Sequence, residues 1–421
     1  MIILSKLGKN KLVKYIGEGD SLMISKSKVF CNVICLFLIF SLFISTSPRA
    51  AELGENNKKG EETSGLNVDA KSALLIEPTT GKVIYEKNSH EKFAPASVTK
   101  IMTMLITMEK IDSKKIKLSD KVTVSENAKK MGGSSMILET GEIRTVEELL
   151  KGIAIASGND AAVAISEYLG GSQENFATMM NERAKELGMK DTHFVNCTGL
   201  SAKEHYSSAF DIAIMSQELL KHPQILKYSG TYMETISEGR KTPIGLVNHN
   251  KLVRFYKGCD GLKTGFTEEA KYCISATAVK DGVRVIAVIM GAPTYKVRNR
   301  DAGELMTYGF SKFENKKIVE KNSPIEKVNL NKKGDKFFLA KSHEDLNLVV
   351  EKGNNVKVDH KCTYFENKHG FKKDSPIGFC EFYQDGKLCG KVQLYCDRDV
   401  KKEGIFEYFK YNMGRVFDNA I

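Results

Sequence analysis

The chain has 421 residues, of which 42% are apolar and 27% are charged, and its formal net charge is +11. The length is sufficient for two domains, and the composition is too apolar for a disordered chain. Beyond the first fifty residues no apolar run approaches the roughly eighteen positions of a spanning helix, which excludes a polytopic membrane protein. The excess of basic residues would suit a nucleic-acid partner. Whether it indicates one depends on where the basic residues lie along the chain.

The N-terminal segment has the layout of an export signal. Six lysines lie within residues 1–28, and the apolar run VFCNVICLFLIFSLFIS follows. We predict that residues 1–51 are an export signal, or a retained anchor because the cleavage site is poor, with Met23 as an alternative start. Their removal leaves 56 basic and 50 acidic residues that are interleaved along the chain. We therefore expect no nucleic-acid partner.

The middle of the chain predicts an α/β domain. Residues 52–65 are a polar tether, and residues 72–88 read as two short strands around a turn. Apolar positions at helical spacing predict helices over residues 98–110 and 146–169. Residues 272–292 predict a hairpin with an Asp-Gly turn.

Strands at both ends with helices between them predict an antiparallel sheet built from both ends of the segment and flanked by helices. We place this domain at residues 66–316. Residues 317–398 are Lys-rich and strand-like, which predicts a small all-β domain.

The C-terminal residues 400–421 predict an amphipathic helix. Its apolar face would gather Ile405, Phe406, Phe409, Met413, Val416 and Phe417. With Lys401, Lys402, Lys410 and Arg415 beside or opposite this face, the helix would suit a membrane interface. Docking on the β domain or on another subunit is the alternative.

Seven cysteines follow the export segment: Cys197, Cys259, Cys273, Cys362, Cys380, Cys389 and Cys396. An odd number without a C-x-x-C pair argues against a full disulfide framework and against a zinc site. A hairpin turn at Asp385-Gly386 would make Cys380 and Cys389 diagonal neighbours. Buried free thiols are the favoured expectation, and a bridge between those two is the alternative.

The first chemical motif is S-x-x-K in PASVTKIMT. Ser97 opens a helical pattern, and Lys100 lies one turn later on the same face. A serine hydroxyl becomes a nucleophile when a base removes its proton, and a lysine is such a base only when its pKa is lowered. The pattern also occurs at Ser25 in the export segment, and a simple N-cap would explain Ser97 alone.

Two further motifs follow. S-x-N occurs at Ser157 and Asn159, after an apolar run, and also at Ser125 in a polar stretch; in isolation, Asn159 reads as a helix C-cap. K-T-G occurs once, just before the predicted hairpin and hence on a strand. Its glycine would let a ligand backbone approach, while the lysine and threonine offer a cation and a hydroxyl to a carboxylate.

S-x-x-K, S-x-N and K-T-G in this order, with gaps of about 60 and 105 residues, are typical of active-site serine penicillin-binding proteins and class A β-lactamases. The chain resembles the low-molecular-mass penicillin-binding proteins, specifically serine-type D-alanyl-D-alanine carboxypeptidases. The resemblance covers about residues 66–312 and continues more loosely to the end. It includes the stretches KFAPASVTKIMT, GSSMIL, GLVNHNKLV, GLKTGFTEEAKYC and GAPTYKVRNRDAGELMTYGF. It implies a β-lactamase/transpeptidase-like fold with a mostly helical subdomain.

The resemblance also implies residue roles. Ser97 would be the acylated nucleophile, Lys100 its base, and Ser157 the relay of a proton to the leaving D-alanine nitrogen. The backbone N–H groups of Ser97 and Phe266 would form the oxyanion hole. The substrate-binding residues would be Asn159, Lys263, Thr264, Gly265, Phe266 and Arg298.

Within this set, Asn159 would hold a peptide amide, and Lys263, Thr264 and Arg298 would bind the terminal carboxylate. Two residues depart from the family pattern. Phe266 stands where some members have His, and His249 stands where some have Arg, which removes a possible substrate contact.

The implied reaction removes the terminal D-alanine from peptidoglycan stem pentapeptides through a serine acyl-enzyme, on the cell-wall side of the membrane. β-Lactams would acylate the same serine. Residues 160–262 contain no E-x-x-L-N segment of the kind that a β-lactamase needs for deacylation. D,D-endopeptidase, transpeptidase and β-lactamase activity, or a non-catalytic cell-wall binding module, are the alternatives. The implied mechanism requires neither a metal nor an organic cofactor, and the absence of H-E-x-x-H and G-x-G-x-x-G signals agrees with this.

Overall fold

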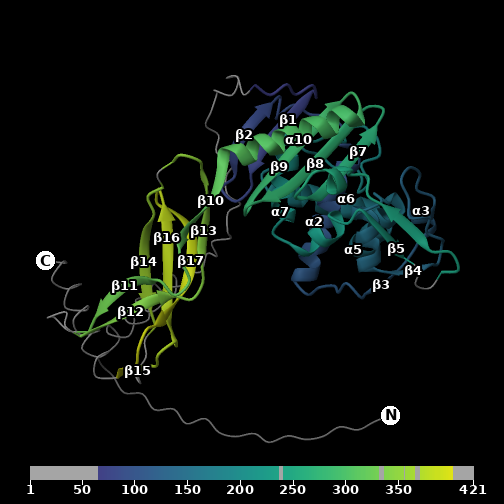
Figure 1. Cartoon of the computed structure of the whole chain (residues 1–421). Helices are drawn as coiled ribbons and strands as arrows, with labels where there is room; N and C mark the ends of the chain where they lie inside the picture. Colours follow the sequence, from purple (N-terminus) through teal and green to yellow (C-terminus); the bar gives the residue numbers. More distant parts are fainter. Residues whose placement is uncertain (1–64, 237–239, 331–335, 355, 366–369, 402–421) are drawn as a thin grey trace, which may run out of the picture. The chain divides into compact units, whose positions relative to one another are not determined.

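The computed structural model describes residues 65–236, 240–330, 336–354, 356–365 and 370–401 (Figure 1). The predicted export segment and the predicted tether up to residue 64 lie outside these residues, as do residues 402–421 of the predicted terminal helix. In the part of the chain that the structure describes, no helix is both long enough and apolar enough to cross a membrane.

A five-stranded antiparallel sheet forms the centre of the first domain, with strand order β2-β1-β9-β8-β7 (Figure 1). Its strands are β1 (Ser72–Glu77), β2 (Lys82–Lys87), β7 (Cys259–Thr267), β8 (Lys271–Lys280) and β9 (Val283–Ala292). The first strand pairs with the last along its length. The predicted sheet, assembled from both ends of the segment, is therefore confirmed.

The hairpin between β8 and β9 turns at Asp281 and Gly282, whose φ angles are 50° and 77°. A two-residue type I′ hairpin turn requires positive φ angles at both central residues. Asp and Gly adopt such angles more readily than most residues, which is why this dipeptide predicts the turn.

The helices and small hairpins lie between these strands in sequence, except for the long helix that follows β9. They are η2 (Ala96–Thr99), α2 (Lys100–Asp112), β3 (Lys121–Thr123), α3 (Glu126–Lys129), β4 (Ile143–Thr145), α4 (Val146–Ala154), α5 (Asn159–Gly170), α6 (Gln173–Glu186), α7 (Ala209–Leu219), α8 (Gln224–Ser229), β5 (Met233–Ile236), β6 (Ile244–Val247), α9 (Leu252–Phe255) and α10 (Tyr295–Lys312).

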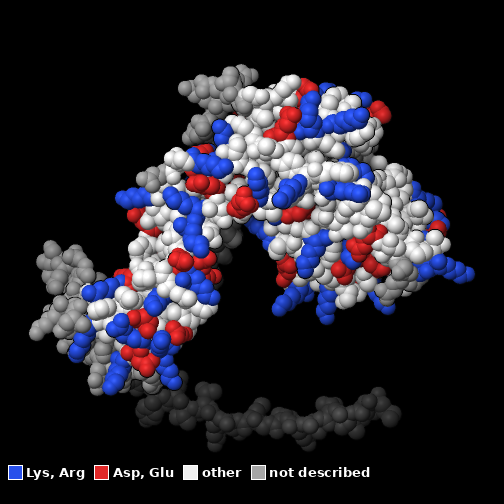
Figure 2. All heavy atoms as spheres, viewed as in Figure 1, with Lys and Arg blue, Asp and Glu red and all other residues white. Residues whose placement is uncertain are grey.

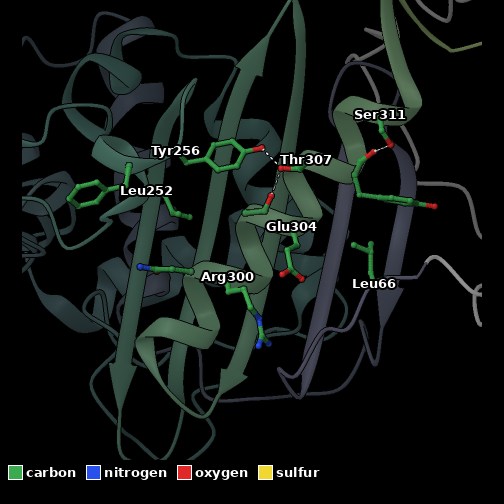
Figure 3. A pocket seen from close by; sticks show the side chains of 11 residues that line it. Leu66, Leu252, Tyr256, Arg300, Glu304, Thr307 and Ser311 are labelled. Atoms are coloured by element: carbon green, nitrogen blue, oxygen red, sulfur yellow. Dashed lines mark hydrogen bonds between the residues drawn. The ribbon is translucent and has the colours of Figure 1, made fainter.

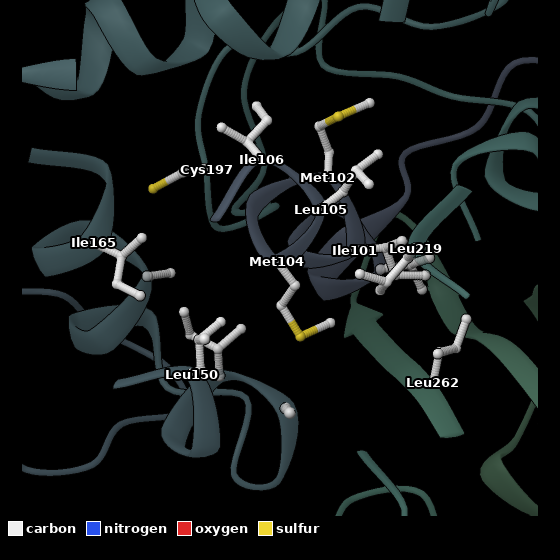
Figure 4. Packing of buried hydrophobic residues seen from close by; sticks show 14 of the residues in the cluster. Ile101, Met102, Met104, Leu105, Ile106, Leu150, Ile165, Cys197, Leu219 and Leu262 are labelled. Atoms are coloured by element: carbon white, nitrogen blue, oxygen red, sulfur yellow. The ribbon is translucent and has the colours of Figure 1, made fainter. Parts of the chain in front are cut away.

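Both faces of the sheet are buried. Leu74 and Ile76 of β1 belong to a core that includes α2, α4, α5 and α7, whereas Ala73 and Leu75 belong to a second core that includes α10. This division follows from the two-residue period of a strand. Helix α2 is buried from Lys100 through Met108, and its apolar side chains fill the first core (Figure 4).

The predicted helix over residues 146–169 is wrong in its middle. Helix α4 ends at Ala154 and α5 begins at Asn159. Between them Ser157 has a φ of 60°, a left-handed value that an α-helix does not accommodate. Apolar residues recur at helical spacing on both sides of the break, in α4 and in α5. The apolar pattern therefore did not reveal where one helix ends and the next begins. Asn159 is consequently the first residue of a helix and not a C-cap.

The second domain is all-β, as predicted. It begins at Phe313, directly after α10, and contains a five-stranded sheet of order β11-β12-β17-β16-β14. Its strands are β10 (Phe313–Val319), β11 (Pro324–Asn329), β12 (Phe337–Ser342), β13 (Leu346–Glu351), β14 (Asp359–Tyr364), β15 (Gly370–Phe371), β16 (Pro376–Gln384), β17 (Lys387–Cys396) and β18 (Val400–Lys401).

The last of these strands corrects the predicted start of the terminal helix at residue 400. Val400 and Lys401 pair with β15 as a strand. Val400 is 5% exposed and belongs to the core of the β domain, so its burial favours the strand at this point.

All seven described cysteines are free thiols and five of them are buried, in agreement with the favoured expectation. The diagonal placement of Cys380 beside Cys389, on which the alternative bridge depended, is not found. Asp385 and Gly386 do form the predicted turn, but an irregularity between Phe382 and Tyr383 shifts the pairing of β16 with β17. The Cys389 thiol consequently donates to the Phe382 carbonyl oxygen. Cys380 instead lies opposite Cys362 on β14.

Candidate active site

The Ser97 and Lys100 side chains meet at the start of α2. Lys100 is completely buried, and its Nζ lies 3.0 Å from Ser97 Oγ, 2.6 Å from Asn159 Oδ1 and 2.7 Å from the Thr198 carbonyl oxygen. The short 3₁₀ turn before α2 holds Ser97 partly open to solvent. The first two sequence motifs thus converge on one amine.

Burial lowers the pKa of Lys100 to about 7, although the Cys197 thiol and the Asp160 carboxylate oppose this shift. A neutral amine has two N–H groups and one lone pair. The two shortest contacts, to Asn159 and Thr198, are with oxygens that only accept, so they would use both N–H groups. The lone pair is then left for the Ser97 hydroxyl, which is the arrangement that a general base requires.

Asn159 joins this cluster to the loop before α4. Its side-chain Nδ2 donates to the Gly132 carbonyl oxygen at 2.6 Å, and its backbone N–H donates to the Ser134 carbonyl oxygen at 2.7 Å. The side-chain amide is therefore engaged at both ends in this structure. It positions Lys100. Only the second N–H of Nδ2 and the second lone pair of Oδ1 would remain for a substrate.

Asp160 and Thr198 were not identified from the sequence. The Asp160 carboxylate is 1% exposed and accepts from the Ser135 hydroxyl and from the backbone N–H groups of Met136 and Leu138. The stretch GSSMIL, which contains Ser135 and Met136, was noted only for its resemblance. Neither residue carries a local pattern, because each acts through contacts distant in sequence.

Ser157 occupies the break between α4 and α5, with a side chain that is 2% exposed. None of the hydrogen bonds among the described residues uses its hydroxyl. Left-handed backbone at a non-glycine residue is uncommon and is concentrated at functional sites. The hydroxyl is therefore available to a bound molecule.

The K-T-G motif lies on β7, as predicted, and packs against the turn that carries Ser97. A Cβ on Gly265 would lie 2.9 Å from the Ser97 backbone nitrogen and 3.0 Å from the Pro95 carbonyl oxygen. The sequence predicted that a ligand backbone approaches this glycine closely. The structure shows a close approach, but the backbone is that of Pro95 and Ser97 in the protein itself. Glycine allows the strand to lie beside Ser97.

Three buried basic side chains, those of Lys100, Lys263 and Arg298, gather at this site. Lys263 and Arg298 are 2% and 6% exposed, and Lys263 Nζ donates to the Thr264 carbonyl oxygen. Burial, followed by the charges of Lys100 and Arg298, holds the pKa of Lys263 well below its usual range. Burial also lowers the pKa of Arg298 to about 10.

Among the described residues, no carboxylate lies within ion-pair distance of Lys100, Lys263 or Arg298. Buried cations that lack an acidic partner destabilise one another, and a bound anion would relieve this repulsion. The site is consequently suited to a carboxylate.

The two departures from the family pattern border these cations. Phe266 is 45% exposed and lies 4.4 Å, centroid to centroid, from the Tyr272 ring. Burial and the neighbouring Lys263 lower the pKa of His249 to about 4, so its imidazole is neutral near pH 7.

The asparagines on either side of His249 have a structural role that the sequence did not indicate. Asn248 Nδ2 donates to the Ser229 and Thr231 carbonyl oxygens, and Asn250 Nδ2 donates to the Gly261 carbonyl oxygen at 3.0 Å. These bonds fix the start of β7, and through it the position of the K-T-G motif.

The second S-x-N copy is structural. The Ser125 hydroxyl caps α3 by accepting from the Ala128 backbone N–H. The second S-x-x-K copy, at Ser25, lies outside the described residues.

A cavity of about 570 Å³ lies elsewhere in the first domain (Figure 3). None of its lining residues belongs to the three motifs. They are Leu66, Leu252, Phe255, Tyr256, Asn299, Arg300, Gly303, Glu304, Thr307, Tyr308 and Ser311.

Comparison with known proteins assigns the family. Residues 57–294 match the D-alanyl-D-alanine carboxypeptidase family of S11 peptidases. The chain belongs to this family. Residues 313–402 match the C-terminal domain of penicillin-binding protein 5.

Individual relatives agree with this assignment. The D-alanyl-D-alanine carboxypeptidase DacF of Bacillus subtilis is 46% identical over 387 residues, which cover 91% of this chain and 98% of DacF. Penicillin-binding protein 5 of Haemophilus influenzae is 30% identical, with a TM-score of 0.59 over 80% of this chain and 98% of that one. Penicillin-binding protein D2 of Listeria monocytogenes, solved with ampicillin bound, is 32% identical, with a TM-score of 0.53 over 58% of this chain and 99% of that one.

We predict that Gly265→Ala slows acylation by a fluorescent penicillin by up to about 100-fold, which is the effect of a misplacement of about 1 Å at a reacting centre. The new Cβ would meet the Ser97 and Pro95 backbone, which cannot move aside as a flexible side chain can. Stopped-flow or gel-based labelling measures the rate. Gly245→Ala is the matched control, because no atom lies within 4 Å of its added Cβ. Equal rates in the two variants would contradict the prediction.

Proposed function

We propose that the protein removes the C-terminal D-alanine from peptidoglycan stem pentapeptides through an acyl-enzyme on Ser97. The observation that carries the proposal is the contact between Ser97 Oγ and a buried Lys100 whose pKa is about 7. Membership in the D-alanyl-D-alanine carboxypeptidase family supports it.

In the proposed first step, neutral Lys100 removes the Ser97 hydroxyl proton as the oxygen attacks the carbonyl carbon of the penultimate D-alanine. The backbone N–H groups of Ser97 and Phe266 would stabilise the negative charge on the carbonyl oxygen. Ser157 would pass a proton to the departing nitrogen, and free D-alanine would leave. Water then hydrolyses the ester and restores Ser97.

Substrate binding would use the cation cluster. A terminal carboxylate placed among Lys263, Thr264 and Arg298 would neutralise charges that otherwise repel one another. A substrate ending in an amide would gain no such stabilisation. This charge requirement favours action at a peptide C-terminus.

The acyl-enzyme formed with a β-lactam should be long-lived. Asp160 is the buried acid whose charge acts on Lys100, and donors from residues 135 to 138 occupy its oxygens. It is therefore not a base that could activate a deacylating water. This occupancy supports the carboxypeptidase over the β-lactamase alternative.

We expect the full chain to release free D-alanine from a pentapeptide ending in D-alanyl-D-alanine, and Ser97→Ala to abolish the release. Coupled D-amino-acid oxidase assays would quantify the product. Ser125→Ala is the control, since this serine only caps α3 and its loss costs about 1 kcal/mol of stability. Undiminished release by Ser97→Ala would refute the acyl-enzyme.

The rate of acylation should depend on pH through Lys100. Because the base acts in its neutral form, the rate should rise about tenfold per pH unit below pH 7 and then level off. A pH–rate profile of kcat/KM measures this rise.

Lys100→Arg is the matched variant for this profile, because a guanidinium keeps its proton across this range. It should lose activity at every pH and show no rise near pH 7. A rise that persists in this variant would assign the titration to another group.

The location follows from segments outside the described residues and is a proposal on sequence grounds. Residues 1–51 would direct export, and residues 402–421 would hold the protein at the outer face of the cytoplasmic membrane through their apolar face and lysines. Relatives that trim cell-wall peptides would need the same location. On the face that Figure 2 shows, basic and acidic side chains are interspersed.

Deletion of residues 402–421 should release the protein from membranes and leave D-alanine release unchanged. Sedimentation with vesicles that contain anionic lipid measures the first effect, and the pentapeptide assay measures the second. The full chain at high salt is the control for a purely electrostatic attachment. Unchanged sedimentation of the truncated form would favour docking of the tail or a retained N-terminal anchor.

A further inference from the structure

Two cysteines face each other across the outer strands of the β domain. Cys362 on β14 is the direct partner of Cys380 on β16, and their sulfur atoms lie 2.8 Å apart. Cys380 is fully buried, whereas Cys362 is partly exposed. No other sulfur–sulfur contact occurs in the part of the chain that the structure describes.

The backbone at this position fits a disulfide. Directly opposed residues of an antiparallel pair have Cα atoms about 4.5 to 5.5 Å apart, and disulfides are compatible with Cα separations of about 4.4 to 6.8 Å. A bond therefore requires only a small adjustment of the two side chains and no movement of the strands.

The other thiols of the β domain are oriented differently. Cys389 Sγ donates to the Phe382 carbonyl oxygen and Cys396 Sγ to the Arg398 carbonyl oxygen. Each of these thiols is paired with backbone, and neither faces a second sulfur. Among the cysteines of the β domain, the strand pairing thus places only Cys362 and Cys380 side by side, whereas the sequence allows several pairs.

We propose that Cys362 and Cys380 form a structural disulfide in the exported protein. The inference rests on the export part of the proposed function, because disulfides persist in oxidising compartments outside the cytoplasm. The catalytic chemistry of Ser97 plays no part in it.

Formation requires a disulfide oxidant, either a small-molecule disulfide or a disulfide oxidoreductase. The more exposed Cys362, as the thiolate, attacks one sulfur of the oxidant and releases its first thiol. Cys380, as the thiolate, then attacks Cys362 Sγ in the mixed disulfide and releases the second thiol. Two protein thiols become one disulfide, and one oxidant disulfide becomes two thiols.

The bond would secure an edge strand. In the five-stranded sheet, β14 pairs with β16 on one side only. An edge strand is held by fewer backbone hydrogen bonds than a central strand and is exposed to slippage and to pairing with other chains. A covalent link between directly opposed residues fixes both its attachment and its pairing.

A metal site is the competing use of these sulfurs. The His360 imidazole, together with Cys362 and Cys380, forms a group whose ligand atoms all lie within 4.8 Å of one another. Two sulfurs bound to a tetrahedral zinc ion at about 2.3 Å each are separated by roughly 3.8 Å. The observed separation is 2.8 Å, and His360 is exposed, so the geometry favours the disulfide.

The test is a non-reducing peptide map of the full chain, recovered from the exported fraction and alkylated with N-ethylmaleimide before digestion. Trypsin separates the cysteines cleanly, since Cys362 lies in the peptide 362–368, Cys380 in 374–387 and Cys389 in 388–391. We expect 362–368 joined to 374–387, at a mass lower by two hydrogens than the sum of the free peptides. Prior reduction should yield the two alkylated peptides separately.

Cys380→Ser should remove the joined species and leave Cys362 alkylated, whereas the matched control Cys389→Ser should retain it. In the oxidised wild type, amide exchange in β14 should be slower than in the reduced wild type. This second comparison needs no variant and therefore remains valid if Cys380→Ser folds poorly.

Three outcomes would overturn the proposal: complete alkylation of both cysteines in the unreduced exported protein, a link between Cys380 and Cys389, or one zinc ion per chain that is lost in Cys380→Ser. D-alanine release is measured on the same samples. Its absence in the wild type would count against the proposed function, while the peptide map would still decide the disulfide.

Discussion

The burial of Lys100 is the constraint on which the active site depends. An amine without contact to water keeps its proton only at a large cost, which is why its pKa falls to about 7. Its three contacts are all with neutral oxygens, from Ser97, Asn159 and Thr198. A carboxylate in place of any of these oxygens would hold the proton on the amine and remove the base. The absence of charge on the three oxygens that contact Lys100 is therefore as important as their positions.

The fold supplies these oxygens from segments distant in sequence. The turn η2 brings Ser97, the start of α2 brings Lys100, the start of α5 brings Asn159, and the loop after α6 brings Thr198. At Gly199 an added Cβ would lie 1.8 Å from the Ala96 carbonyl oxygen, so this loop packs directly on the turn that carries Ser97. Strand β7 closes the other side of the turn at Gly265. Two glycines thus allow backbone to approach Ser97 from two directions.

The charges of the protein have two different uses. On the face that Figure 2 shows, basic and acidic side chains are mixed, and exposed pairs of this kind contribute little to stability. At the active site, Lys100, Lys263 and Arg298 are buried without an acidic partner among the described residues, which prepares a site for an anion. The positive net charge of the sequence is uninformative about this difference, because it counts both groups equally.

The sequence by itself determined the features that depend on neighbouring residues. These include the hairpin at Asp281-Gly282, whose turn needs positive φ angles, and the one-turn spacing of Ser97 and Lys100. The order of the three motifs also identified the family. Tertiary structure decided the rest. The break at Ser157 depends on packing, and the partner of Cys380 depends on which strand lies beside β16, and local spacing encodes neither. The pKa of Lys100 required the fold above all, because desolvation is produced only when distant segments assemble around the amine.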